Sequence, residues 1–306
     1  MKRLPILLTA VLLAIVPTVA RELSFLPIPV VRADPGGLDL VKVKVEDRDE
    51  YFLIDTGCAR SMLFSTPLAK ELGKELKPAG QLGGIGGKMD AYTTDFETVI
   101  IGGRLRVSGA SSMVGAVDHL ESLQVDGVTA NPQGLLGGKI LTSANAVFDL
   151  GGGRILVPGE GVGADDYRTA MTSQGMRIVE LKSGKHDLPF VGVEIGGELF
   201  AFLMDTGANA NTIEPSLVEH LGIPTEASDV EVKGAGKVAG VSRASVDTLR
   251  IPGGVVLKNV PFHVIATGSD QLAPEGMKAG GILGSRLLHQ IKARIDFGSR
   301  TLVLPK

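Results

Sequence analysis

The chain has 306 residues but only one cysteine, Cys58, and no tryptophan. A single cysteine excludes an intrachain disulfide and a cysteine-rich zinc site. Aromatic residues make up 4% of the sequence, so little material is available for stacking on bases or sugars. The net charge is −3 and no basic cluster stands out, which argues against a nucleic-acid partner.

Histidines are also few, and they lie apart from one another without the spacing typical of metal ligands. We therefore expect no metal site and no other cofactor. The five histidines are His119, His186, His220, His263 and His289.

Long hydrophobic runs are missing except at the N-terminus. Residues 1–20 (MKRLPILLTAVLLAIVPTVA) combine two early basic residues, an apolar run and a small residue before a cleavage position after Ala20. This is the pattern of a secretory signal peptide, which predicts a secreted or periplasmic protein. The alternative is an uncleaved membrane anchor, although the apolar run is short for a membrane span.

Glycine, by contrast, is abundant, with 41 residues. Glycines supply tight turns and positive φ angles, so this composition favours many short strands joined by turns over long helices. We therefore predict an all-β protein with only short helices.

The strongest positive feature is an internal repeat. Residues 51–57 (YFLIDTG) return as residues 201–207 (AFLMDTG). Each copy follows a β-type stretch: residues 38–45 alternate hydrophobic and polar side chains, and residues 189–195 are rich in β-branched and aromatic types. The repeat predicts two halves that fold alike, each delivering one aspartate at the end of an apolar strand.

The two halves remain alike further along the chain. A short helix is predicted after each copy, at 65–73 and 214–222, because each segment has proline in its first turn and glycine at its end. An apolar-apolar-glycine triplet then follows, at 135–137 (LLG) and at 282–284 (ILG). The repeat therefore extends over most of each half.

These landmarks divide the chain into a signal segment at 1–20, an N-terminal lobe at 21–158, a linker at 159–177 and a C-terminal lobe at 178–306. The linker is placed where glycine and charged residues show no apolar periodicity. Residues 109–133 are interpreted as an irregular insertion in the first lobe.

Both halves also carry a glycine-rich segment, at 82–92 and at 232–242, between β-type runs. Each is predicted to form a mobile hairpin, or flap, that folds over a bound peptide and excludes water. A phosphate loop is excluded in the first segment because Leu82 stands where the first glycine is needed and Met89 follows the lysine. The flap candidates are Gly84, Gly86, Gly87, Gly234 and Gly236.

Asp55 and Asp205 end the two repeated strands. Two carboxyl groups that face each other cannot both ionise cheaply, so the pair shares one proton. One carboxyl can then act as an acid while the other draws a proton from a water held between them. This chemistry requires neither a metal nor a covalent nucleophile.

The neighbours of both aspartates suit this role. Gly57 and Gly207 let the backbone approach the carboxyl groups, where a Cβ atom would collide. Thr56 and Thr206 offer hydroxyl groups that can bond across the interface between the lobes.

At these residues the chain resembles the aspartic peptidase clan, and it is closer to the retropepsin-like bacterial branch than to pepsin. The resemblance covers residues 38–306. In this clan, two aspartates that share one proton are an established example of such a pair. It implies two pseudo-symmetric, β-barrel-like lobes with a cleft for an extended peptide. It also implies that Asp55 and Asp205 form the catalytic pair and that Thr56 and Thr206 bracket the lobes. Retroviral members build this site from two identical chains, whereas both halves lie here in one chain, so a monomer is sufficient.

The sequence departs from pepsin-type enzymes at the residues that directly follow Gly57 and Gly207. Those enzymes carry serine or threonine there, whereas this chain has Cys58 and Ala208. Ala208 matches the retroviral pattern. No equivalent of the pepsin flap tyrosine is evident, although Tyr92 lies beside the first hairpin.

The expected function is therefore that of an aspartic endopeptidase acting on a peptide or protein substrate. Three other interpretations remain open: a catalytically silent peptide-binding module of the cell envelope, an enzyme that processes its own N-terminus, and two aspartates that only stabilise turns. A thiol nucleophile at Cys58 is disfavoured because no pattern places a histidine beside it. Asp149 and Asp296 match each other across the repeat, and we expect them at structural hairpin turns.

Overall fold

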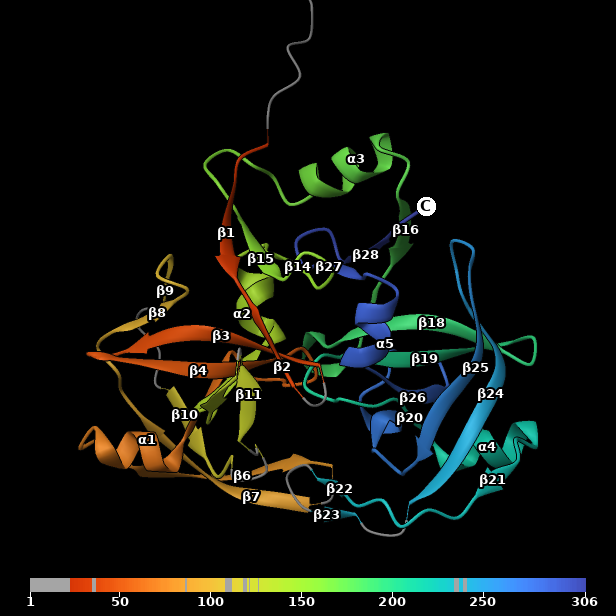
Figure 1. The fold of residues 1–306 in the computed structure, drawn as a ribbon, viewed down its shortest axis with the longest axis horizontal. Coiled ribbons are helices and arrows are strands. Elements are labelled where there is room, and N and C mark those ends of the chain that lie inside the picture. Colours follow the sequence, from red (N-terminus) through yellow and green to blue (C-terminus); the bar gives the residue numbers. More distant parts are fainter. Residues whose placement is uncertain are drawn as a thin grey trace, which may run out of the picture.

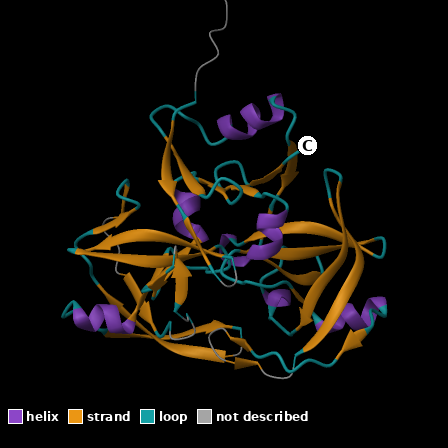
Figure 2. Ribbon diagram, in the orientation of Figure 1, coloured by secondary structure: helices purple, strands orange, loops and turns teal. Residues whose placement is uncertain are grey.

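The fold is described by a computed structural model. The described residues are 23–34, 37–85, 87–107, 112–117, 120, 122–125, 127–233, 237–238 and 241–306. The segment 1–20 and the flap candidates Gly86, Gly234 and Gly236 lie outside them. Strands dominate the ribbon and the helices are short, as expected from the glycine-rich sequence (Figure 2).

The N-terminal lobe is built on one mixed sheet of ten strands (Figure 1). Its order is β6 (Lys77–Gly84), β7 (Gly87–Thr94), β10 (Ser112–Gly115), β5 (Met62–Ser65), β13 (Gly134–Gly137), β4 (Arg48–Asp55), β3 (Leu38–Val45), β8 (Val99–Ile101) and β9 (Leu105–Val107), with β2 (Val31–Ala33) paired to β3.

The C-terminal lobe repeats this plan in a sheet of eight strands. Its order is β17 (Lys182–Ser183), β18 (Pro189–Ile195), β19 (Glu198–Asp205), β26 (Ala279–Gly284), β20 (Thr212–Ile213), β25 (Val255–Val264), β24 (Ser242–Ile251) and β21 (Thr225–Glu226). In both lobes the aspartate strand runs parallel to the strand that carries the apolar-apolar-glycine triplet, β13 beside β4 and β26 beside β19.

A third sheet, of six strands, joins the two halves. β14 pairs with β27 in antiparallel register, so strands from both halves form one continuous sheet. In Figure 1 this sheet lies at the top, opposite the hairpins β6–β7 and β22–β23 at the bottom. Its order is β1 (Phe25–Pro29), β15 (Arg154–Pro158), β14 (Val147–Asp149), β27 (Arg294–Asp296), β28 (Thr301–Leu304) and β16 (Arg177–Glu180).

Two two-stranded sheets and the helices complete the described fold. The two-stranded sheets are β11 (Leu123–Val125) with β12 (Val128–Ala130), and β22 (Val232–Lys233) with β23 (Lys237–Val238). The helices are α1 (Thr66–Glu71), α2 (Gly138–Ser143), α3 (Asp166–Ser173), α4 (Pro215–Leu221) and α5 (Ser285–Gln290), with 3₁₀ turns η1 (Lys185–Asp187) and η2 (Ser269–Gln271). The prediction of an all-β fold with two similar lobes and short helices is confirmed.

The predicted linker, 159–177, contains helix α3. Tyr167 and Met171 on this helix are buried and pack with Val147 and Val303 of the six-stranded sheet. Burial of these side chains attaches the segment to the joining sheet, so it is an ordered part of the fold. The segment 109–133, interpreted as an irregular insertion, includes β10 and the hairpin β11–β12.

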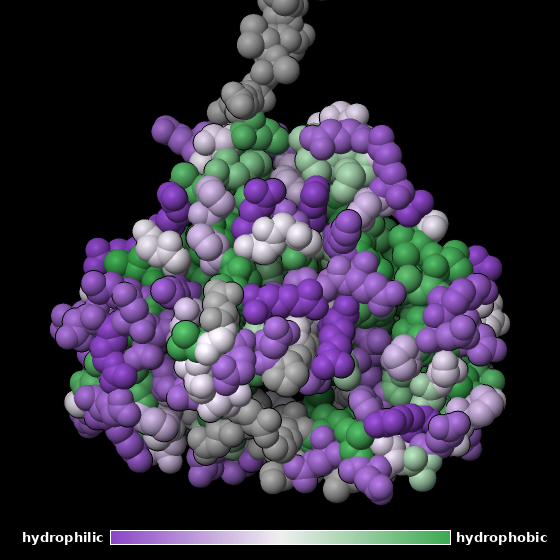
Figure 3. All heavy atoms as spheres, viewed as in Figure 1, coloured by the Kyte–Doolittle hydropathy of each residue, from purple (hydrophilic) through white to green (hydrophobic). Residues whose placement is uncertain are grey.

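The main hydrophobic core runs through both lobes and into the joining sheet. Its largest side chains include Phe52, Phe64 and Phe148 from the first half and Phe200 and Phe202 from the second. Hydrophilic residues cover most of the face shown in Figure 3, as expected for burial of the apolar side chains inside. Within the described residues no helix is long and apolar enough to cross a membrane.

Candidate active site

Strands β4 and β19 end at Asp55 and Asp205 and carry them to the middle of the molecule. The residues before each aspartate are buried, which anchors the ends of both strands. Gly137 lies beside Asp55 and Gly284 lies beside Asp205 in the parallel ladders. Glycine is required there because an added Cβ atom would lie 1.8 Å from the Arg60 carbonyl oxygen at one position and 2.5 Å from the Ala210 carbonyl oxygen at the other.

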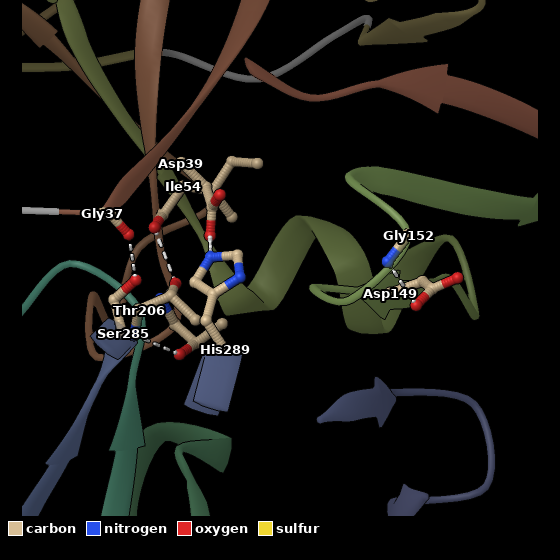
Figure 4. Close-up of polar contacts among 9 residues, drawn as sticks. Gly37, Asp39, Ile54, Asp149, Gly152, Thr206, Ser285 and His289 are labelled. Atoms are coloured by element: carbon tan, nitrogen blue, oxygen red, sulfur yellow. Dashed lines mark hydrogen bonds and ion pairs between the residues drawn. The ribbon is translucent and has the colours of Figure 1, made fainter. Parts of the chain in front are cut away.

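Thr56 and Thr206 connect the two lobes by four reciprocal hydrogen bonds. The Thr56 hydroxyl donates to the Met204 carbonyl, and the Thr206 hydroxyl donates to the Ile54 carbonyl, both at 2.6 Å. Each hydroxyl also accepts from the other threonine's backbone N–H, at 3.1 and 3.2 Å. Both side chains are fully buried, so the bracket predicted from the sequence is present, and Figure 4 shows the Thr206–Ile54 bond.

The glycines of the two repeats each face the aspartate of the opposite lobe. A Cβ atom on Gly57 would lie 2.6 Å from the Asp205 carboxyl carbon, and one on Gly207 would lie 2.6 Å from the Asp55 carboxyl carbon. The structure therefore brings all six predicted site residues into one cluster. The catalytic role of Asp55 and Asp205 stays a prediction.

The two carboxyl groups differ in their hydrogen bonds. Asp205 Oδ1 accepts the backbone N–H of Gly207 at 2.8 Å. Asp55 Oδ1 is buried and has no hydrogen-bond partner among the described residues. Leaving a buried anionic oxygen without a donor is costly, so this asymmetry favours the neutral form at Asp55.

The electrostatics agree with this difference. Burial, followed by the negative charge of Asp205, raises the pKa of Asp55 well above its ordinary value. Backbone hydrogen bonds from Cys58 and Gly57 oppose this rise. Burial also raises the pKa of Asp205, where hydrogen bonds from Asp55 and from the backbone oppose the rise. Each residue as a whole is half-buried. Both pKa values are raised, and the unpartnered Oδ1 favours Asp55 as the neutral member of the pair.

Cys58 follows the first glycine, and its backbone N–H donates to the Asp55 carbonyl at 3.2 Å. Burial and the nearby Asp55 charge raise the pKa of the thiol to about 12. Because the thiolate is the nucleophilic form, a thiol held protonated at neutral pH is a poor nucleophile. The structure thus supports the interpretation of Cys58 as a packing residue.

Two of the flap candidates, Gly84 and Gly87, lie in the hairpin β6–β7. Gly84 ends β6 and Gly87 begins β7, and the two residues pair at the tip of a mostly exposed hairpin. Between them stands Ile85, which packs against a hydrophobic cluster of the C-terminal lobe. Ile85 is not among the residues predicted for the site, although an isoleucine among four glycines is a local signal for a contact at the tip.

Sequence reasoning also missed a contact between the lobes. His289 Nε2 on α5 lies 2.7 Å from Asp39 Oδ2 on β3, and both side chains are almost fully buried. Beside them the Ser285 hydroxyl donates to the Gly37 carbonyl at 2.5 Å, as Figure 4 shows. No motif connects residues so far apart in the sequence, so only the fold reveals this pair.

Asp149 and Asp296 lie at turns of the joining sheet, as expected. Asp149 accepts the Gly152 N–H at 2.9 Å (Figure 4). It also pairs with Arg154 and Arg294. Asp296 accepts the backbone N–H groups of the following turn. Across the part of the chain that the structure describes, no group of three or more acidic, histidine or cysteine residues is arranged to hold a metal.

Comparison with known proteins gives a consistent family assignment. The sequence profile of the family described as aspartyl protease matches residues 41–140 and 191–287, once in each half. No curated protein matches the sequence significantly.

Among solved structures, the aspartic proteinase of Irpex lacteus is similar, with a TM-score of 0.50 and 13% identity over 92% of this chain and 97% of that one. Conglutin gamma, a basic 7S globulin of lupine seeds, matches with a TM-score of 0.45 and 10% identity over 93% of this chain and 95% of its own. A retropepsin-like aspartic protease of Rickettsia conorii matches with a TM-score of 0.30 and 20% identity over 42% of this chain and 89% of its own. At these identities the similarity to the Irpex protein shows the fold alone.

Proposed function

Because this chain belongs to the aspartyl protease family, we propose that it is an aspartic endopeptidase that hydrolyses peptide bonds with the Asp55–Asp205 pair. The observation that carries the proposal is the reciprocal packing of the pair. Each carboxyl group lies against the glycine of the opposite lobe, and the two buried threonines hold both loops in place. A dyad built this way is preorganised, which lowers the cost of reaching the reactive geometry.

In the proposed reaction Asp205 acts first as the base and Asp55 as the acid. Asp205 takes a proton from the bound water while the water oxygen forms a bond to the substrate carbonyl carbon. Asp55 donates its proton to the carbonyl oxygen, which gives a tetrahedral diol. The carbon–nitrogen bond then breaks as the leaving nitrogen receives the proton held by Asp205, and a diol hydroxyl returns its proton to Asp55.

The flap β6–β7 supports a polypeptide substrate. Its strand β6 is an exposed edge of the ten-stranded sheet, so its backbone can pair with an extended chain. One chain carries both aspartates, so a monomer is sufficient for the proposed site. No metal or other cofactor takes part in the proposed chemistry.

We further propose that the protein acts outside the cytoplasm, in the periplasm or after secretion, with an uncleaved anchor as the alternative. The support is the pattern of residues 1–20 alone. Cell fractionation with mass spectrometry of the mature N-terminus tests this. A protein that begins after Ala20 in the periplasm or medium is the expected result, and an intact N-terminus in a cytoplasmic fraction would contradict it.

The test of the activity is digestion of a diverse peptide mixture from about pH 3 to pH 7, read by mass spectrometry. Wild type is compared with Asp55→Asn and Asp205→Asn, each shown by circular dichroism to be folded. Cuts made by wild type and lost in both variants are the expected result. Cuts that survive in either variant would exclude the dyad. Peptide binding without any cut would instead support a silent binding module.

A further inference from the structure

Three buried side-chain atoms have no hydrogen-bond partner among the described residues. One is Asp55 Oδ1 of the dyad, and the other two are Thr212 Oγ1 and His263 Nδ1. Leaving a buried polar group unpaired costs free energy, so each one in a native protein calls for an explanation. The dyad accounts for Asp55, whereas the proposed mechanism does not use Thr212 or His263.

Thr212 and His263 are neighbours in a row of side chains that crosses the C-terminal sheet. They are partners in the parallel pair of β20 with β25. Residues opposite each other in adjacent strands project from the same face of a sheet, so the strand pairing defines the row. From β18 through β19, β26, β20, β25 and β24 to β21, the row is Phe190, Leu203, Ile282, Thr212, His263, Arg243 and Glu226.

This row lies on the face of the sheet from which Asp205 projects. Leu203 stands two residues before Asp205 on β19, and side chains two apart in a strand point to the same side. Ala208 and Ile85, the latter from the tip of the hairpin β6–β7, pack against the apolar cluster that includes Leu203. At about 4.8 Å per strand, Thr212 lies about 10 Å from β19 along the row. That distance suits a substrate residue beyond the two that flank the scissile bond.

The N-terminal lobe has an equivalent row with different chemistry. In strand order from β3 through β4, β13, β5, β10 and β7 to β6, it is Leu40, Leu53, Leu135, Leu63, Met113, Thr93 and Lys77. Leu63 stands where the C-terminal lobe has Thr212, and Met113 stands where it has His263. The duplicated fold thus places two hydrogen-bonding groups on one side of the dyad and two apolar side chains on the other.

The unpaired groups define what can bind. Burial, followed by the charge of Arg243, lowers the pKa of His263, so the neutral ring is favoured. Arg243 itself is exposed and lies opposite Glu226, so solvent and that carboxylate weaken its attraction for an anion. Burying a carboxylate beside a neutral ring is therefore costly. A carboxamide carries a donor and an acceptor, so it can bond the threonine hydroxyl and either tautomer of the ring.

We propose that Thr212 and His263 form a subsite for a carboxamide side chain of the substrate, glutamine or asparagine. Selection acts on one side of the scissile bond, because Leu63 and Met113 offer no such bonds on the other. The hairpin β6–β7 must lift to uncover both polar atoms, since they are buried while its tip rests on the neighbouring cluster. This inference rests on the proposed function, because it assumes that a peptide lies across the dyad.

The test uses substitutions that remove one polar group at a time. Thr212→Val deletes the hydroxyl, and His263→Met installs the residue of the other lobe. Met113→Leu, at the equivalent place in the N-terminal row, is the matched control. All proteins are compared on peptides that vary one position at a time, on both sides of the cut, among glutamine, glutamate and methionine, which are similar in length.

Wild type should cleave glutamine peptides about 10-fold faster than methionine peptides at one position beyond the flanking pair. Thr212→Val and His263→Met should each lower this ratio by about 3-fold or more, and Met113→Leu should leave it unchanged. A wild-type ratio near one at every position would overturn the inference. So would a stronger preference for glutamate, or a glutamine preference that survives in both variants.

Thermal stability separates a binding role from a structural one. Thr94 is also a buried threonine, but its hydroxyl donates to the Glu75 carbonyl at 2.8 Å. Thr212→Val removes an unpaired hydroxyl, so the Tm should stay the same or rise, whereas Thr94→Val should lower it. A comparable fall in both variants would show that Thr212 is bonded inside the protein through a buried water, which would overturn the inference.

The same peptides, with the scissile amide reduced to a methylene-amine, are also titrated by calorimetry. Binding needs no turnover, so it tests selectivity even if the protein does not cut. Cleavage without a glutamine preference contradicts the inference and keeps the proposed function. Preferential binding of the glutamine peptides without cleavage contradicts the proposed function and keeps the inference. Failure to bind any peptide of the set contradicts both.

Discussion

Helices α2 and α5 follow equivalent strands in the two halves, yet they meet the opposite half in different ways. His289 on α5 pairs with Asp39, and Ser285 at the start of the same helix bonds to Gly37. At the equivalent place on α2 stands Thr142, whose hydroxyl bonds only within its own helix, to Gly138. A small cavity lies there, lined by Thr142, Leu181, Lys182, Ser183, Asp187, Pro189, Asp296, Phe297 and Arg300.

The difference shows that the two halves are more alike at some places than at others. Backbone and side chains match closely where both halves form the dyad and its threonine bracket. Away from that centre, β14 and β27 still pair symmetrically in the joining sheet, but helices α2 and α5 do not make the same contacts. The two halves are therefore held together by the symmetric bracket, by the joining sheet and by one-sided contacts around α5.

The largest effect on peptide cleavage is expected from substitutions that fill the space beside Gly57 and Gly207. Gly57→Ala and Gly207→Ala each put a Cβ atom 2.6 Å from a carboxyl carbon, so the opposite aspartate must move. Each variant should lose about 10²-fold or more of its peptide cleavage rate. Gly163→Ala is the control, because its Cβ atom would meet the Asp166 carboxyl group at ordinary contact distances of 3.6 to 3.8 Å. A normal rate in either site variant would show that the two loops are not packed as described.

The asymmetry between the two helices is tested by His289→Leu against Thr142→Val. Removing His289 leaves the buried carboxyl of Asp39 without its partner, which should lower the free energy of unfolding by about 3–5 kcal/mol. Thr142→Val removes one local hydrogen bond and should cost less than about 1 kcal/mol. Urea unfolding measures both changes.

His289→Gln is the control, because its amide can still donate to Asp39 and should recover part of the loss. Similar losses in His289→Leu and Thr142→Val would mean that the pair adds nothing beyond ordinary packing.

For the symmetric bracket of Thr56 and Thr206 we expect equal losses of stability from the two halves, in contrast to the two helices. Thr56→Val and Thr206→Val each keep the side-chain shape but leave a buried carbonyl and a buried N–H unsatisfied. Each should lower the free energy of unfolding by about 2–4 kcal/mol. Chemical denaturation should give the same value for both within about 0.5 kcal/mol. A clear inequality would mean that one lobe contributes more to the interface than the bonds suggest.

The smallest effect concerns pH and the two carboxyl groups. The pKa of Asp55 is raised in the folded protein, so its contribution to stability is present below the ordinary aspartate pKa and is lost as the pH rises through the raised value. Asp55→Asn stays neutral, so it should match wild type in acid and exceed its stability at neutral pH. Asp205→Asn should show a smaller gain, because hydrogen bonds oppose the rise in the pKa of Asp205.

Denaturation of both variants and wild type across acid to neutral pH measures this difference. The reverse order would place the shared proton on Asp205. The same raised pKa values predict that cleavage falls as the pH rises and the pair loses its proton.

The aspartates and threonines were predictable because the signal is local and occurs twice. Each strand ends in Asp-Thr-Gly, and a duplicated unit must bring equivalent residues to equivalent places. The position of the hairpin β6–β7 was predictable from its glycines. The contact between Ile85 and the C-terminal lobe was not, because the local sequence carries no information about the other lobe. The helix in the predicted linker escaped notice because its apolar face is narrow and consists of Tyr167, Ala170 and Met171.

The amino-acid sequence alone thus determined the duplication, the two aspartates, their threonine and glycine partners, and the strand-rich halves. These features follow from short-range patterns of polarity, turn residues and repetition. Only the tertiary structure decided that Asp55 Oδ1 has no partner among the described residues, that Ile85 packs on the other lobe, and that His289 meets Asp39 from 250 residues away. Such contacts depend on how two finished lobes pack, and packing between distant segments leaves no periodicity in the sequence.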